Sequence, residues 1–175
     1  MTIFDGVRKG DVALAVGTTA LGALLMIENI QAGADSDVRV DSHSWLLLPV
    51  FAAATLPVLW RRRSMPAVLA VTAVALAVHV LAFGSLVRCG AGLPLAFALA
   101  YGVGRLMAGR ASWLGLAAVT GIQFLVLVRD TAAGLEIIPV TALLGAAAWG
   151  VGVWLRQRAV RSASVSVPAP SVAHA

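Results

Sequence analysis

The sequence has few charged residues for its length of 175. Asp, Glu, Lys and Arg together make up 12% of the chain, whereas an ordinary soluble domain holds about 25%. Hydrophobic residues make up 60%, and the mean hydropathy is +0.92. So little charge cannot cover the surface of a water-soluble globule of this size. The composition therefore excludes a soluble domain and a disordered chain, and it indicates an integral membrane protein.

Cysteine is almost absent, since Cys89 is the only one. A single thiol forms no intramolecular disulfide and no cysteine metal cluster, which excludes a disulfide-stapled secreted module. We interpret Cys89 as an unpaired loop cysteine, with a bridge between two subunits as the alternative. The chain also lacks a Walker A sequence, an H-E-x-x-H pair and a nucleophile elbow. We therefore expect no enzyme activity, no cofactor and no metal.

Six long apolar stretches are present, separated by short polar breaks. Backbone groups find no hydrogen-bond partners in lipid, and these stretches are apolar on every face, so helices are predicted rather than barrel strands. The predicted fold is an all-α, polytopic transmembrane helical bundle of about six helices. The stretches are Val12–Ile30, Trp45–Trp60, Ala67–Phe83, Leu93–Met107, Trp113–Val128 and Ile137–Leu155.

The basic residues predict the orientation of the bundle. With the N-terminus inside, ten of the 13 Lys and Arg residues fall in inner segments, and six of the eight acids fall in outer ones. Short loops rich in Lys and Arg stay in the cytoplasm. We therefore predict a multi-pass protein of the cell (cytoplasmic) membrane, N-in and C-in, with no nucleic-acid partner despite its net charge of +5. The inner-loop anchors of this topology are Arg61, Arg62 and Arg63.

The chain divides into three predicted parts. Residues 1–11 form a cytoplasmic N-terminal segment, 12–155 the six-helix membrane domain, and 156–175 a basic stretch followed by a tail. The tail Arg161–Ala175 has no helical period and is predicted to be disordered. The small residues Ala32, Gly33 and Ala34 after the first apolar stretch imitate a signal-peptide cleavage site. We favour an uncleaved signal-anchor because that stretch is longer than a typical signal core.

Among the polar residues, His79 is the most informative about function, because ionisable side chains within a span are costly and often functional. It is interpreted either as a hydrogen-bonded contact between helices or as a sensing group. Glu28 is predicted on the same outer side, so the two side chains are candidates for a pair that responds to external pH. His79 and Glu28 are therefore the predicted sensing residues.

Other polar and small residues have structural interpretations. Gln123 is predicted to hydrogen-bond across the bundle, and Arg105 to reach the inner headgroups. The acidic outer loop holding His43 is interpreted as solvated rather than as a calcium loop. Glycines that allow close packing of the helices are Gly102, Gly104, Gly145, Gly150 and Gly152, and the acids of the outer loop are Asp35, Asp37 and Asp41.

Three segments resemble one known family. Leu56–Ala70 (LPVLWRRRSMPAVLA) looks like the "LPL-x-hydrophobic-RRR-x-P-L-A-V-L" join between the second and third helices of actinobacterial sensor histidine kinases. Ala98–Arg105 resembles the family's "L-x-x-Y-x-x-x-R", and Trp149–Arg158 resembles its "G-x-x-x-R-x-R" exit from the last helix. The resemblance covers about residues 5–160 and implies a membrane input domain of a two-component signal transduction system.

The kinase core of that family has no counterpart in the sequence. The phosphoacceptor-histidine motif and the ATP-binding domain are missing, so no catalytic residue is carried over. We expect either a relative without a kinase or the sensor part of a broken gene. The predicted function is a sensor-like domain that couples membrane or envelope state to a cytoplasmic partner through the last helix. The predicted output residues are Trp154, Arg156 and Arg158.

Two alternatives belong to other functional classes. A small transporter component would place a polar row facing His79 and Gln123 across the bundle. A structural subunit of a membrane complex would leave a wide face of small residues exposed. The expected partners are the lipid bilayer and either a second copy of the chain or a cytoplasmic kinase or regulator.

Overall fold

The computed structural model describes residues 6–32 and 39–165, and over these residues the chain is helical. Six α-helices are present, which confirms the predicted all-helical bundle. The one pairing of extended backbone in the described part is a single bridge between Leu86 and Asp130. The helices are α1 (Lys9–Gln31), α2 (Leu47–Thr55), α3 (Met65–Phe83), α4 (Cys89–Leu106), α5 (Gly109–Leu127) and α6 (Ile138–Val165), with the 3-10 helices η1 (Leu56–Trp60) and η2 (Leu135–Ile137).

Five helices, all except α2, are long and apolar enough to cross a membrane, as in a multi-pass membrane protein. The sixth apolar segment, Leu47–Trp60, is shorter and combines α2 with η1. The change from α to 3-10 geometry falls at Pro57, which has no N–H to donate to an α-helical ladder. The carbonyl of Ala54 instead accepts a hydrogen bond from the Thr72 hydroxyl of α3 at 2.9 Å. The change of geometry at Pro57 is therefore compensated by a contact with the next helix.

Helix α4 begins at Cys89, earlier than the predicted Leu93. The reason is a cap supplied from the loop after α5. The Asp130 carboxylate accepts the backbone N–H groups of Arg88 and Cys89, both at 2.6 Å. A carboxylate at a helix N-terminus satisfies free N–H groups and opposes the positive end of the helix dipole.

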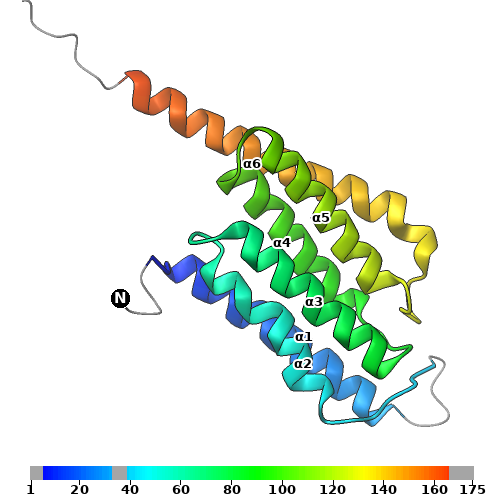
Figure 1. Ribbon diagram of the computed structural model, residues 1–175. Helices are drawn as coiled ribbons and strands as arrows, with labels where there is room; N and C mark the ends of the chain where they lie inside the picture. Colours follow the sequence, from blue (N-terminus) through cyan, green and yellow to red (C-terminus); the bar gives the residue numbers. More distant parts are fainter. Residues whose placement is uncertain (1–5, 33–38, 166–175) are drawn as a thin grey trace, which may run out of the picture.

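The helices pack side by side, and α4 lies inside the bundle against α1, α5 and α6 (Figure 1). Large apolar side chains from α1 to α5 form one continuous core. The outward faces of α1, α3, α5 and α6 expose large apolar side chains, as expected of a surface that meets lipid. Core residues include Met26, Phe51, Leu76, Leu95, Leu99 and Ile122.

The closest helix contact joins α4 to α6 through two glycines. A Cβ added at Gly104 would meet the carbonyl of Trp149, and one added at Gly152 would meet the carbonyl of Tyr101. Both collisions involve backbone, so only glycine permits this approach. The packing role predicted for these two glycines is confirmed. The same prediction for Gly150 is wrong, because its Cβ position meets open space.

Helix α6 continues to Val165, well past the predicted end at Leu155, and its orange end projects beyond the other helices (Figure 1). The predicted disorder of the tail is therefore wrong for Arg161–Val165, where the α6 ladder simply continues. Several predictions lie outside the described residues: the rest of that tail, the acids Asp35 and Asp37, and the small residues Gly33 and Ala34.

Candidate functional site

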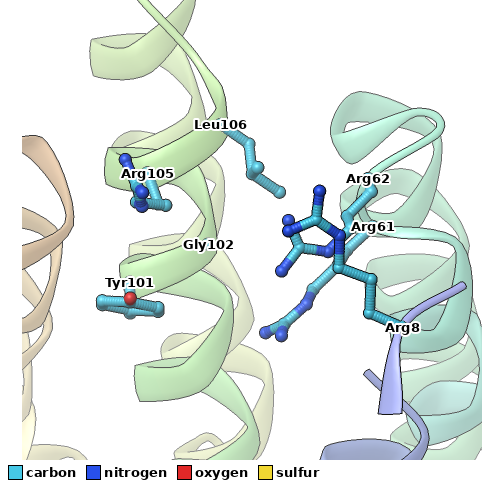
Figure 2. Close-up of a pocket in the computed structure, with 7 residues that line it drawn as sticks. All are labelled: Arg8, Arg61, Arg62, Tyr101, Gly102, Arg105 and Leu106. Atoms are coloured by element: carbon cyan, nitrogen blue, oxygen red, sulfur yellow. The ribbon is translucent and has the colours of Figure 1, made fainter. Parts of the chain in front are cut away.

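One end of the bundle carries a pocket rich in arginine, which we call the arginine pocket. Its volume is about 370 Å³. The pocket has two walls. The first is formed by Arg8, just before α1, and by Arg61 and Arg62, just after η1. The second is formed by the last turns of α4. Figure 2 shows three guanidinium groups gathered on the first wall, facing α4. The lining residues are Arg8, Arg61, Arg62, Tyr101, Gly102, Arg105 and Leu106.

A single carboxylate organises the first wall of the arginine pocket. Asp11 is fully buried in the first turn of α1. Its Oδ1 accepts Arg61 Nε at 2.6 Å, and its Oδ2 accepts Arg62 Nε at 2.8 Å. The backbone N–H of Arg8 also donates to Oδ2, at 3.1 Å. This network fixes the η1–α3 turn against the start of α1.

The pocket holds more positive charge than its surroundings neutralise. Four arginines line it, and Asp11 is the one carboxylate that the described structure joins to them. Each guanidinium carries five N–H donors, and Arg61 and Arg62 each use Nε on Asp11. The remaining donors suit the oxygens of a phosphate, sulfate or carboxylate. No group of three or more His, Cys, Asp or Glu side chains suited to a metal occurs among the described residues. The unused guanidinium donors make the pocket chemically suited to an anion.

The second wall of the pocket packs backbone to backbone against α6. Tyr101 and Arg105 line the pocket from α4, and the carbonyl of Tyr101 and the N–H of Arg105 face Gly152. Backbone in contact with backbone leaves little freedom for one helix to move without the other. This part of α4 is therefore packed tightly against α6.

The opposite end of the bundle holds a second arginine in very different surroundings, which we call the Arg88 clasp. Arg88 is fully buried between α3 and α4. Its Nε donates to Nδ1 of His79 at 3.1 Å, Nη1 to the carbonyl of Arg129 at 3.1 Å, and Nη2 to the carbonyl of Gly84. Burial lowers the pKa of Arg88 to about 10, so the guanidinium is charged at neutral pH. Each side-chain nitrogen of Arg88 has an acceptor.

Neighbouring polar groups extend this clasp. The Asn29 side chain donates to the carbonyl of Val87 at 2.9 Å and accepts its N–H at 3.0 Å, which joins α1 to the α3–α4 loop. Asp41 accepts the N–H of Ser85 at 2.8 Å. That hydrogen bond, together with one from Arg39, lowers the pKa of Asp41 to about 2. The clasp therefore ties together the loops at this end of the bundle.

The structure separates the two predicted sensing residues. His79 is fully buried, hydrogen-bonded to Arg88 and in edge contact with the rings of Phe51 and Phe83. Because Nδ1 accepts a hydrogen bond, the proton of the neutral ring belongs on Nε2. Glu28 is exposed on α1. The interpretation of His79 as a contact between structural elements is the one that the geometry supports.

The predicted output residues lie on the far part of α6. Trp154 is 55% exposed, and the guanidinium of Arg158 lies 5.5 Å from its ring centre. Arg156 is partly buried and has one buried nitrogen, Nη1, without a hydrogen-bond partner in the described structure. Arg63 is exposed and does not line the arginine pocket, unlike Arg61 and Arg62.

Gln123 bonds across the bundle as predicted, since its Nε2 donates to the carbonyl of Thr141 at 3.0 Å. It faces Gly145 on α6, whereas His79 faces Arg88. Gln123 and His79 therefore contact different parts of the bundle. His43 Nε2 lies 2.9 Å from the carbonyl of Ala32, and Cys89 is a free thiol at the start of α4.

The sequence alone does not reveal the roles of Asp11, Asp130 and Arg88, whose contacts organise the two ends of the bundle. The sequence pattern places Asp11 among the inner acids and Asp130 among the outer acids, and it predicts no partner for either. A signal for Asp11 was present, because it is one of only two acids on the side that holds ten basic residues. Arg88 gave no such signal, since an arginine in an outer loop is usually solvated.

No protein-family model, no curated protein and no solved structure matches the chain.

Proposed function

We propose that this chain is a sensor-type protein of the cytoplasmic membrane that binds an anionic group in the arginine pocket and reports it through α6. Six crossings place the arginine-rich end, the N-terminus and the C-terminus in the cytoplasm. The distribution of Lys and Arg supports this orientation.

The proposed sixth crossing is the shorter segment formed by α2 and η1. Asp11 joins the start of α1 to the residues that follow η1, so both lie at the arginine-rich end. Asn29, near the end of α1, lies at the clasp end. The chain must therefore return through α2 and η1 from one end of the bundle to the other. Their rise is about 24 Å, against about 30 Å for a typical hydrocarbon core, so this is the shortest of the six proposed crossings.

The observation that carries the functional proposal is the position of the pocket between two groups of helices. Arg8, Arg61 and Arg62 belong to the α1–α3 group, whereas Tyr101 and Arg105 belong to α4, which packs on α6. An anion that touches both walls favours the packing in which they are close. A ligand shifts such an equilibrium only through different affinities for the two packings. The arginine pocket meets that requirement because its two walls can bind one anion together.

The proposed output is the part of α6 that extends beyond the bundle. Contact of α4 with Gly152 passes the movement to Trp154, Arg156 and Arg158, which lie next along the same helix. A cytoplasmic kinase or regulator would read this exposed, basic segment. The proposed input lies at the opposite end from His79 and Glu28, whose sensing role remains a prediction.

A distance measurement tests this proposal. Spin labels are attached at Arg63→Cys, after η1, and at Gln157→Cys, on α6, in a Cys89→Ser background; residues 63 and 157 are exposed. Pulsed electron spin resonance then compares nanodiscs of phosphatidylcholine alone, with inorganic phosphate, and with phosphatidylglycerol. We expect at least one anion to shift the distance distribution between the two labels.

Two matched variants assign that shift to the pocket. Arg105→Gln removes a pocket arginine, while Arg110→Gln removes an exposed arginine at the same end that does not line the pocket. We expect the first variant to lose the shift and the second to keep it. An identical distribution under all three conditions, or a shift that Arg105→Gln retains, contradicts the proposed input.

A further inference from the structure

We infer that the anion of the arginine pocket is the headgroup of an anionic phospholipid from the cytoplasmic leaflet, with an acyl chain held in an adjoining apolar groove. The inference rests on the proposed function for the pocket and names its ligand. Its first support is charge, because four arginines line the pocket and the described structure pairs only one buried carboxylate, Asp11, with them. Basic pockets between helices at the cytoplasmic side suit lipid phosphates.

The second support is an apolar groove of about 390 Å³ between α3 and α5. Small side chains leave this groove open, and larger ones close its sides. The groove follows α3 for about two turns toward the middle of the bundle. Its lining has the apolar character that an acyl chain requires. The lining residues are Pro66, Leu69, Ala70, Ala73, Met107, Ala111, Leu114, Gly115 and Ala118.

The arginine pocket and this groove adjoin one another along the chain. Leu106 lines the pocket, and the next residue, Met107, lines the groove. Gly102 also lines the pocket and lies against the side chain of Met65, whose neighbour Pro66 lines the groove. The pocket and the groove therefore lie at the same end of the bundle, as a headgroup and its acyl chain require. A free phosphate uses the pocket alone, so the two sources predict different behaviour.

Thermal unfolding of the full chain in a nonionic detergent distinguishes these ligands. Phosphatidylglycerol, phosphatidylcholine with the same acyl chains, glycerol phosphate and inorganic phosphate are each titrated. We expect phosphatidylglycerol to raise the melting temperature at concentrations at least tenfold lower than the other three. Equal stabilisation by inorganic phosphate overturns the lipid inference but leaves the proposed anion input intact. No stabilisation by any anion overturns both.

Charge-matched variants locate the headgroup. Arg8→Gln with Arg105→Gln removes two pocket arginines that have no hydrogen bond to Asp11 through their side chains, so the Asp11 network is retained. Arg63→Gln with Arg110→Gln removes two exposed arginines outside the pocket at the same end. We expect the first pair to weaken phosphatidylglycerol binding roughly tenfold or more and the second much less. Equal weakening by both pairs indicates diffuse attraction and overturns the site.

Neighbouring alanines on α5 test the groove in the same titration. Ala118 lines the groove, whereas Ala117 is exposed and does not. We expect Ala118→Phe to reduce the preference for phosphatidylglycerol over glycerol phosphate, because the phenyl ring occupies the place of the lipid acyl chain. Ala117→Phe should leave that preference unchanged. If both variants keep the full preference, the acyl chain lies elsewhere and that part of the inference fails.

Discussion

The two ends of the bundle use arginine in opposite ways. At the Arg88 clasp, one guanidinium is fully buried and each of its nitrogens donates to an acceptor of the chain. At the arginine pocket, four arginines line an open volume, and only Arg61 and Arg62 pair with the buried carboxylate of Asp11.

This difference separates an arginine whose hydrogen bonds are completed within the fold from arginines that line an open pocket. A buried charge is tolerated when hydrogen bonds replace its hydration. The clasp meets this condition with acceptors from α3, the α3–α4 loop and the end of α5. The pocket does not meet it internally, so water or an anion must supply the missing oxygens.

The largest expected effect comes from removing the clasp arginine. Arg88→Met leaves His79 Nδ1 and the carbonyls of Gly84 and Arg129 without their donor. We expect a loss of about 3 kcal/mol or more in the free energy of unfolding. Thermal or denaturant unfolding in detergent measures it. The matched control is Arg129→Met, because the exposed side chain of Arg129 takes no part and only its carbonyl does. Equal stability of the two variants would mean that the clasp does not hold the fold.

The second effect distinguishes the pocket from the clasp by its response to anions. Asp11→Asn removes the charge that Arg61 and Arg62 share, so we expect a loss of about 2 kcal/mol. The same change raises the positive charge of the pocket, so added phosphatidylglycerol should restore more stability to this variant than to the parent chain. Glu28→Gln, an exposed acid on the same helix, is the control and should change neither quantity. A variant that gains nothing extra from the lipid would place Asp11 outside the anion site.

The third effect tests the connection from the pocket to α6. Gly152→Ala places a Cβ against the carbonyl of Tyr101, so we expect a loss of about 1–3 kcal/mol and a weaker response of the α6 label to anions. Gly150→Ala adds the same methyl group where nothing lies within 4 Å. That control should be neutral or slightly stabilising, since alanine favours helix. Unfolding and the label distance are measured on both variants, and a parent-like response of Gly152→Ala would argue against this route.

The smallest effect concerns the edge of the clasp and depends on pH. Hydrogen bonds from Ser85 and Arg39 lower the pKa of Asp41 from 3.8 to about 2. A lowered pKa in the folded state means that this contact stabilises the fold above about pH 4, and that the contribution is lost as the pH falls toward 2. Asp41→Asn should lower the melting temperature slightly at pH 7, where the parent chain has the full contribution, and should therefore show a smaller decrease between pH 4 and pH 2 than the parent. An unchanged acid profile would show that the contact contributes nothing measurable.

The helices were predictable because each is encoded by a local apolar run, and lipid allows few other structures. Two boundaries were not predictable in this way. The start of α4 depends on Asp130, which lies far along the chain. The length of α6 depends on a polar segment, Arg156–Val165, that continues an existing helix although it has no apolar period of its own.

The charges of the site were predictable, whereas their partners were not. The arginine run at 61–63 indicated an inner loop, but its local pattern treats the three residues alike. The packing of η1 against α1 decides that Arg61 and Arg62 meet Asp11 while Arg63 remains exposed. Arg88 is buried because the α3–α4 loop packs against the segment after α5, where the Arg129 carbonyl accepts its hydrogen bond. Hydropathy does not encode such a contact between distant segments.

A crystal structure grown in a lipid phase containing phosphatidylglycerol tests the contrast between the two ends in a single experiment. We expect phosphate density within hydrogen-bond distance of Arg61, Arg62 or Arg105, and no ligand density at Arg88, whose side-chain nitrogens already have acceptors. A pocket closed by movement of its own side chains, with no anion between the two walls, would contradict the account of a ligand-binding end.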